Sequence, residues 1–591
     1  MTTSSFAKVR SLLTPSQRRG AVILVGLLVV GMMFETLGIG LVIPTLALMT
    51  SEDLAQRYPV LHPLVEALGK PSQAELIRMA MLALVGIYLL KNLFLAFLAW
   101  WQTRYAYAVQ TELSQRLFTG YLRQPYTFHL QRNSAKLIRN VTTEVGMFAD
   151  AIMSALLVAT ESLVLLGVAT LLLTVEPVGA TIVVLVLGGA AWIFYKVTRG
   201  RIARWGIARQ YHEGLRMQHL QQGLGGAKDV KLLGRERDFI EQYRVHNAGS
   251  SRVSRLQATV QQMPRLWIEF LAIVGLATLV ITMLYQGRNM AGVVPTLGLF
   301  AAAAFRLMPS TNRVLSGIQA LRYNSPVIGS LYEELGTIGN HQEAPSSPRH
   351  SGSALSLHTE LDVIDVKFAY PGAVDHALEG LSIKIVRGET VGLIGASGSG
   401  KSTLVDIILG LLTPSEGTVE IDGQDIQTAL RSWQDQIGYV PQSIYLTDDT
   451  LRRNVAFGLP EGQIDDSAVA RAVQAAQLDK FVDGLPARLN TVVGERGIRL
   501  SGGQRQRIGI ARALYHDPAV LVLDEATSSL DNATEHGVMQ AVMALRGSKT
   551  VLIVAHRLTT VQQCDRLYRI EDGKVAAEGK PDEVLRLSKA V

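Results

Sequence analysis

Residues 395–402, GASGSGKS, have the types and spacing of a phosphate-binding loop. An apolar run at 390–394 precedes them and a helix-like run at 403–409 follows, which is the strand–loop–helix order that such a loop needs. Glycines let backbone N–H groups face a polyphosphate, and the following helix N-terminus adds partial positive charge. Lys401 can reach the β- and γ-phosphates, and the Ser402 hydroxyl can bind Mg²⁺. The predicted nucleotide-binding residues here are Gly395, Ser397, Gly398, Ser399, Gly400, Lys401, Ser402 and Thr403.

Other positions could supply further groups for the same chemistry. Tyr370 can stack on adenine, although a tyrosine beside a strand often serves only packing. Gln442 follows a short apolar run, and its amide oxygen can reach Mg²⁺ and an attacking water. A further group precedes a helix-forming segment at 505–511, where N–H groups at a helix N-terminus suit a phosphate. Its members are Ser501, Gly502, Gly503 and Gln504.

Two carboxylates end a buried strand predicted at 520–523. Asp524 is suited to hold Mg²⁺ through water, and Glu525 is suited to polarise the nucleophilic water. A second apolar run ends at His556, which could contact the γ-phosphate. The predicted catalytic residues are therefore Glu525, His556 and Gln442, and the predicted metal ligands are Ser402, Gln442 and Asp524.

These chemical groups occupy less than half of a chain of 591 residues that is 48% hydrophobic and 18% charged. This composition points to membrane spans, because a soluble protein is rarely so poor in charge. Each predicted span has roughly the 20 apolar residues that cross a bilayer. The six predicted spans are 21–48, 77–101, 151–175, 178–196, 267–285 and 293–308.

The distribution of positive charge predicts the topology. Lysine and arginine collect in two long polar segments, 102–150 and 197–264, which the positive-inside rule places in the cytoplasm together with both termini. The net charge of +7 is thus explained without a nucleic-acid partner. The single cysteine, Cys564, excludes an intrachain disulfide and a cysteine-based metal cluster.

The predicted organisation has four parts. Residues 1–20 form a cytoplasmic segment, either a short helix at the membrane surface or a flexible tail, and 21–335 form an all-α six-helix membrane domain. A Ser-, Pro- and Gly-rich linker covers 336–358, and 359–591 form a cytosolic α/β phosphate-loop ATPase domain.

The ordered motifs resemble those of the ABC transporter ATPase domain over 361–591, and six spans followed by one such domain resemble an ABC exporter half-transporter of type IV. The resemblance implies ATP and Mg²⁺ as cofactors, active hydrolysis, and a bacterial inner-membrane location. It also implies a homodimer, since the LSGGQ segment (500–504) of one domain completes the ATP site of another; a partner encoded elsewhere is the alternative. Coupling helices are expected near 125–132 and 222–227.

Cations inside the membrane half are candidates for substrate binding, because charge is costly in lipid. Lys91, Arg265, Arg306 and Arg313 could together bind an anionic lipid headgroup, and arginine binds phosphate well. The alternative is that these cations form structural ion pairs with Glu35, Glu161 and Glu269, or extend to the interface.

Two short stretches, 34–44 and 304–313, are similar to bacterial flippases of lipid-linked oligosaccharides. The similarity implies that a polyprenyl-diphosphate-linked oligosaccharide moves from the inner to the outer leaflet, for protein glycosylation or surface polysaccharide assembly. An exporter of lipid A-type lipids or hydrophobic drugs is the alternative. A membrane-anchored sensor or scaffold is a third possibility, which intact Glu525 and His556 disfavour.

Overall fold

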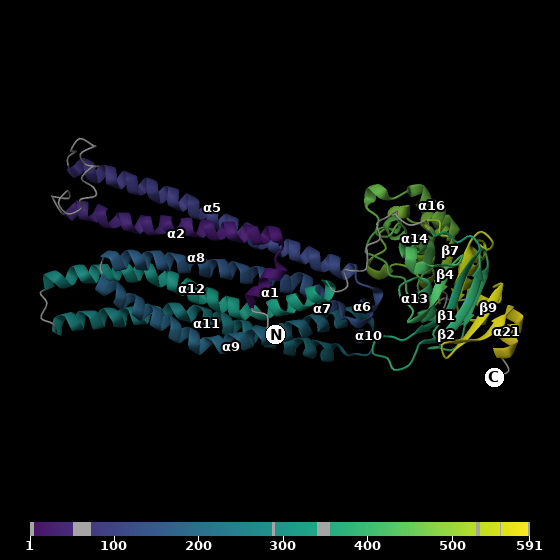
Figure 1. Ribbon diagram of the computed structural model, residues 1–591. Coiled ribbons are helices and arrows are strands. Elements are labelled where there is room, and N and C mark those ends of the chain that lie inside the picture. The colour runs from purple at the N-terminus through teal and green to yellow at the C-terminus, as the bar shows by residue number, and fades with distance from the viewer. Residues whose placement is uncertain are drawn as a thin grey trace. The chain divides into compact units, whose positions relative to one another are not determined.

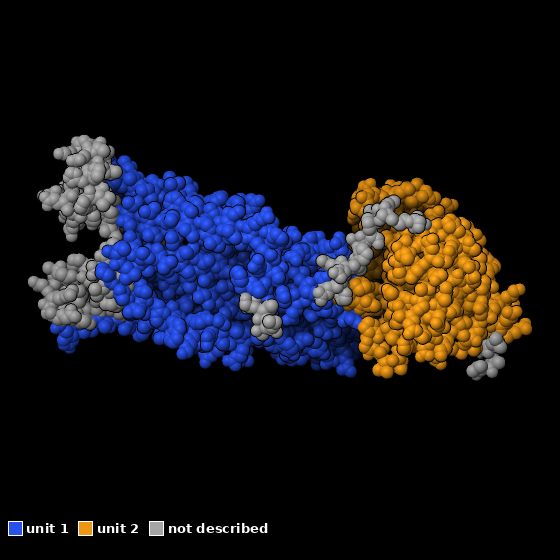
Figure 2. Space-filling model, viewed as in Figure 1, with its two compact units in different colours: residues 1–124, 131–344 blue, residues 125–130, 345–591 orange. Residues whose placement is uncertain are grey.

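The computed structural model describes residues 5–50, 73–175, 177–285, 290–339, 355–526, 532–555 and 557–588. The chain divides into two compact units, shown in Figure 2. The first unit contains Met1–Gln124 and Gln131–Ala344, and the second contains Pro125–Leu130 and Pro345–Val591. The three boundaries between the four predicted parts stay predictions. The structure differs at one point, because helix continues to Gly339, inside the predicted linker at 336–358. The physical reason is that Ile338 is buried, and its carbonyl accepts a hydrogen bond from Gln124.

The first unit is helical throughout its described residues (Figure 1). Its six long helices are α2 Pro15–Thr50, α5 Gln73–Leu122, α8 Val145–Val175, α9 Pro177–Gly225, α11 Glu236–Tyr285 and α12 Met290–Gly339. Its shorter helices are α1 Ser5–Leu12, α7 Ser134–Arg139, the π-helix η2 Asn140–Glu144 and α10 Ala227–Leu232. The second unit contributes α6 Tyr126–Gln131, so a short helix forms near each reversal at which a coupling helix is expected.

Length and apolarity make the long helices suitable for a membrane. Within the described residues, three stretches are long and apolar enough to cross one: Pro15–Leu41, Ile77–Leu122 and Ser134–Thr174. The predicted spans at 178–196, 267–285 and 293–308 fall within α9, α11 and α12. A 50-residue helix such as α5 is roughly 75 Å long, far more than the hydrocarbon core of about 30 Å. The long helices therefore continue well beyond the bilayer.

The start of α2 shows how the sequence sets a helix boundary. Pro15 takes the first helical position, where its missing N–H costs nothing. Thr14 and Gln17 exchange hydrogen bonds, with Gln17 N donating to Thr14 Oγ1 and Thr14 N donating to Gln17 Oε1. Residues 1–20 therefore contain a short helix, α1, followed by a capped start of the first long helix.

The second unit contains two sheets. The larger has strand order β10-β9-β3-β8-β7-β6, and β9, β3, β8, β7 and β6 run parallel; the smaller, β2-β1-β4-β5, is antiparallel. All five residues of β3 and of β8 are buried, as expected for parallel strands covered on both faces.

The strands of this unit are β1 Glu360–Phe368, β2 Leu378–Val386, β3 Thr390–Ile394, β4 Glu416–Ile421, β5 Gln424–Asp425, β6 Ile437–Val440, β7 Val520–Asp524, β8 Thr550–Val554, β9 Arg566–Glu571 and β10 Lys574–Gly579. Its α-helices after Pro345 are α13 Lys401–Ile408, α14 Leu430–Gln434, α15 Leu451–Val455, α16 Asp466–Ala475, α17 Asp479–Asp483, α18 Gly502–Leu514, α19 Asn532–Met543, α20 Leu558–Val561 and α21 Pro581–Ser588. Its 3₁₀ turns are η3 Ile426–Ala429, η4 Glu461–Gln463, η5 Arg488–Asn490 and η6 Glu495–Gly497.

Helices α9 and α12 approach most closely where Gly206 faces the backbone of Tyr323. A Cβ at Gly206 would overlap the Tyr323 carbonyl oxygen, and it would lie 3.4 Å from Cδ of Pro326. Backbone atoms cannot move aside as a flexible side chain can. Glycine at this position therefore sets the separation of the two helices.

Three histidines form a cluster between α9 and α11, beyond the predicted spans of these helices. The Nδ1 atoms of His212 and His246 are 3.1 Å apart, so one ring must donate a hydrogen bond to the other. The ring of His219 stacks on His246 with a centroid distance of 5.3 Å. Burial, followed by the neighbouring His212 and His219, lowers the pKa of His246 below its ordinary value.

We expect Gly206→Ala to destabilise the membrane half by roughly 1–3 kcal/mol, because the added methyl group forces α9 away from α12. The matched control is Gly200→Ala on the same helix, where an added Cβ meets no atom within 4 Å. That substitution should be neutral or stabilising, since alanine forms helix better than glycine. Thermal unfolding of the detergent-solubilised protein measures both variants. Equal melting temperatures would contradict the close approach.

Acidification should loosen the α9–α11 pair. A lowered folded pKa means that the unfolded segment binds the proton more tightly, so stability is full above about pH 6.5 and falls as pH decreases below that value. Glu213, Arg216 and Tyr211 lie near the cluster. Limited proteolysis within α11 at about pH 7.5 and about pH 5.5 tests this expectation. His246→Gln should remove the difference in proteolysis rate between the two pH values. His516→Gln, which is in the other unit, should leave that difference unchanged.

Candidate functional site

The phosphate-binding loop connects β3 to α13, as its sequence pattern predicts. Gly400 caps the N-terminus of α13 with φ +102°, a left-handed conformation that glycine adopts readily. A Cβ there would lie 2.6 Å from the Ala377 carbonyl oxygen, so a larger residue would not fit. The loop therefore keeps its backbone open at the helix N-terminus, where N–H groups can face an anion.

Lys401 is buried at the centre of this loop. Its Nζ donates to the carbonyl oxygens of Gly395 at 3.0 Å and Ala396 at 2.7 Å. Burial lowers the pKa of Lys401, and the nearby carboxylates of Glu525 and Asp524 oppose that shift. The ammonium group is thus held inside the loop that a polyphosphate would enter.

Two of the three predicted catalytic residues lie together. Gln442 Nε2 donates to Glu525 Oε2 at 2.6 Å, although the residues are 83 positions apart in the sequence. Glu525 has φ +47°, which is uncommon for a residue with a side chain and typical of functional sites. Asp524 ends β7 directly before it. The third residue, His556, lies outside the described residues, directly after Ala555 at the end of β8.

The predicted ligands suit Mg²⁺ and a nucleotide. Ser402, Gln442 and Asp524 supply a hydroxyl, an amide and a carboxylate oxygen, which are the hard ligands that Mg²⁺ prefers. Tyr370 is at the edge of the same loop, with its hydroxyl 3.2 Å from Thr403 Oγ1. Tyr370 is 36% exposed, and its ring meets that of Phe368 nearly at a right angle, so part of the side chain is accessible to a ligand.

The LSGGQ segment forms the N-terminus of α18. Ser501 and Gln504 make a capping box: Gln504 N donates to Ser501 Oγ at 3.3 Å, and Ser501 N donates to Gln504 Oε1 at 2.9 Å. Gly502 and Gly503 form the first turn. The side chains of Ser501 and Gln504 bond within their own helix. Among the described residues, no hydrogen bond joins them to the phosphate-binding loop.

Two positioning residues have no motif and were missed in the sequence. Arg512 of α18 donates to the carbonyl oxygens of Asn454 and Tyr445, and burial lowers its pKa to about 10. Glu535 is buried and accepts hydrogen bonds from Arg557 and Thr560, which anchors the segment after position 556. The sequence signal for such a residue is a charged side chain on an otherwise apolar helix face. This signal does not identify the hydrogen-bond partner of the side chain.

In the membrane half, the three predicted substrate cations whose side chains are described each pair with a glutamate. Lys91 pairs with Glu35 at 3.0 Å, Arg265 with Glu269 at 2.9 Å, and Arg313 makes two bonds to Glu161 at 2.6 and 3.1 Å. The side chain of Arg306 lies outside the described residues. Each described cation therefore has its own carboxylate, which is the arrangement expected of structural ion pairs.

Comparisons with known proteins cover both halves of the chain. Residues 30–303 match the family model described as ABC transporter transmembrane region, and residues 378–528 match the model described as ABC transporter. A Cupriavidus pinatubonensis protein named ATP-dependent lipid A-core flippase is 33% identical over 484 residues, covering 81% of this chain and 80% of that protein. A Cupriavidus metallidurans protein of the same name is 32% identical over 508 residues, covering 85% and 84%.

The fold is also similar to that of a solved structure. A bacterial Atm1-family ABC exporter with ATP bound matches with a TM-score of 0.77 at 22% identity, and the match covers 96% of this chain and 97% of that chain. This likeness confirms the predicted fold class, a helical membrane domain followed by an α/β ATPase domain.

We expect Glu525→Gln to reduce ATP turnover by roughly 10²–10⁴-fold while ATP affinity changes little, because the amide cannot accept a proton from the attacking water. Phosphate release and binding of a fluorescent ATP analogue measure the two effects. Glu571→Gln is the control, since Glu571 is exposed at the end of β9 and pairs with Arg569. Similar turnover in the two variants would contradict the role of Glu525.

Proposed function

This chain belongs to the ABC transporter family, and we propose that it moves an anionic, multiply acylated lipid of the lipid A type across a bacterial inner membrane. The family match and the flippase relatives support an ATP-hydrolysing lipid transporter. The observation that carries the cargo proposal is the match to proteins named lipid A-core flippase over four fifths of the chain, across both halves.

The ATPase half supplies the driving reaction with ATP and Mg²⁺. When bound, Mg²⁺ neutralises charge on the phosphates. Lys401 would exchange its two carbonyl partners for phosphate oxygens, and Glu525 would hold the attacking water when Gln442 releases it. Gln442 would thus bond to Glu525 before the reaction and release it when the attacking water is held.

Two copies of the chain are proposed to form the working unit. Each has one phosphate loop and one LSGGQ segment, and in the capping box of α18 the side chains of Ser501 and Gln504 bond to the N–H groups of Gln504 and Ser501. A second copy could place its α18 over the phosphate loop of the first. A homodimer is thus favoured over a single-chain ATPase.

A diphosphate-linked oligosaccharide is the second candidate cargo. The stretches 34–44 and 304–313 favour it, and Arg306 is in the second stretch. Lys91, Arg265 and Arg313 are paired with glutamates, so these three cations favour neither anionic cargo over the other.

Reconstituted proteoliposomes decide between the cargoes. We expect ATP-dependent translocation of lipid A, and stimulation of turnover by lipid A above the level with phosphatidylethanolamine alone. Glu525→Gln is the control without hydrolysis. Translocation of a polyprenyl-diphosphate oligosaccharide, with none of lipid A, would reject the proposed cargo and favour the second candidate. Stimulation by hydrophobic drugs alone would reject both lipids.

A further inference from the structure

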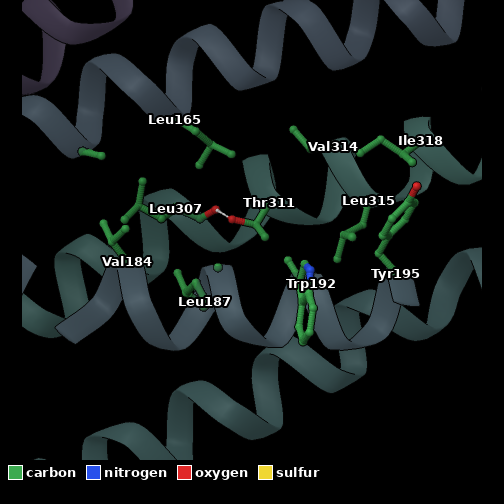
Figure 3. Close-up of a pocket in the computed structure, with 13 residues that line it drawn as sticks. Leu165, Val184, Leu187, Trp192, Tyr195, Leu307, Thr311, Val314, Leu315 and Ile318 are labelled. Carbon is green, nitrogen blue, oxygen red and sulfur yellow. Dashed lines mark hydrogen bonds between the residues drawn. The ribbon is translucent and has the colours of Figure 1, made fainter. Parts of the chain in front are cut away.

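An apolar cavity of about 350 Å³ lies between α8, α9 and α12 in the membrane half. Figure 3 shows side chains of facing helices around it, among them Leu165, Leu187 and Leu315. On α9 the lining runs from Val184 to Tyr195, eleven residue steps or roughly 16 Å along the helix. The cavity is therefore elongated along the membrane helices, and its volume is near the lower end for ligand pockets, about 300–1,000 Å³.

The two hydroxyl groups in this lining have hydrogen-bond partners. The hydroxyl of Thr311 donates to the Leu307 carbonyl oxygen at 2.9 Å, as Figure 3 shows. The hydroxyl of Tyr195 accepts a hydrogen bond from Arg322. Because the rest of the lining is almost entirely hydrocarbon, the cavity suits a hydrocarbon chain better than a polar ligand.

Two cations lie at one end of the cavity. The guanidinium of Arg322 is 5.1 Å from the centre of the Tyr195 ring, and Lys196 Nζ is 4.8 Å from the centre of the Trp192 ring. Both rings line the cavity. This end is the one nearer the cytosolic extensions of α9 and α12, as the charge distribution predicts.

These two cations differ from those predicted to bind substrate. Lys91, Arg265 and Arg313 each have a glutamate within ion-pair distance, whereas Lys196 and Arg322 have none among the described residues. Their charge rests on aromatic rings, which leaves N–H groups available for an anion. Lysine and arginine beside tryptophan and tyrosine are also typical of the membrane interface.

We propose that this cavity binds one acyl chain of an anionic phospholipid, with the lipid phosphate held by Lys196 and Arg322. The small volume accommodates a single chain, so the site suits a resident membrane lipid and not the several chains of a lipid A-type cargo. The inference stands independently of which lipid is exported. The proposal gives α8, α9 and α12 a lipid-binding role that is separate from transport of the cargo.

Two neighbouring glycines of α9 provide a matched test. Gly188 lines the cavity, Gly189 does not, and an added Cβ at either meets no atom within 4 Å. Full-length protein in detergent is incubated with phosphatidylglycerol or phosphatidylcholine of equal acyl length, and bound lipid is counted by native mass spectrometry. The wild-type protein should retain more phosphatidylglycerol. Gly188→Leu should reduce retention of both lipids by about 10-fold, equivalent to about 1.4 kcal/mol of binding free energy. Gly189→Leu should retain both lipids at the wild-type level.

The headgroup contact is tested separately. Combined Lys196→Gln and Arg322→Gln should abolish the preference for phosphatidylglycerol, and Arg199→Gln, which removes an exposed cation one turn along α9, should not. Thermal melting and basal ATP turnover verify that each variant is folded. Equal retention by the Gly188 and Gly189 variants would overturn the proposal. So would retention of no lipid by the wild-type protein, the result expected if a second copy of the chain covers this face.

Discussion

Parallel pairing of β3, β8, β7 and β6 is the constraint on which the nucleotide site depends. Leu393 pairs with Val554, Ile553 with Leu523, and Leu523 with Val440, so the strands end at the same edge of the sheet. Every residue that follows such a strand is delivered to that edge, whatever its distance along the chain. The phosphate loop, Gln442 and the two carboxylates meet for this reason. The buried apolar strands thus position the chemistry, although they contain none of it.

Charge in the membrane half follows a different rule. A cation in an apolar setting is stable only with a partner, and the partner determines what the cation can do. Lys91, Arg265 and Arg313 have carboxylate partners and therefore act first as links between or within helices. Lys196 and Arg322 have aromatic partners, which leave their charge uncompensated. The kind of partner, more than the depth in the membrane, separates structural cations from those able to bind phosphate.

The residues of the motifs could be predicted from the sequence because each motif determines the backbone conformation around it. Lys401 follows the glycines, Glu525 ends an apolar run, and Ser501 precedes a helix, so their places in strand, loop and helix were correct. The partners of Lys91 and Arg313 could only be named as alternatives, since pairing between helices depends on rotation about each helix axis. Arg512 and Glu535 were missed because they act on backbone atoms and neighbouring side chains in segments far away in sequence. The cavity beside Gly188 was missed because small gaps arise from packing and leave no periodic pattern.

Arg512 connects two segments that carry motifs of the nucleotide site. It belongs to α18, whose N-terminus is capped by Ser501, and it donates to the carbonyl oxygen of Tyr445, three residues after Gln442. Among the described residues no carboxylate balances its charge, which rests on carbonyl oxygens and on the Phe457 ring at 4.4 Å. Backbone carbonyls hold a guanidinium at fixed angles, so the contact is rigid. Arg512 therefore fixes α18 to the backbone that follows Gln442, so the LSGGQ turn at the start of this helix and the segment after Gln442 belong to one packed unit.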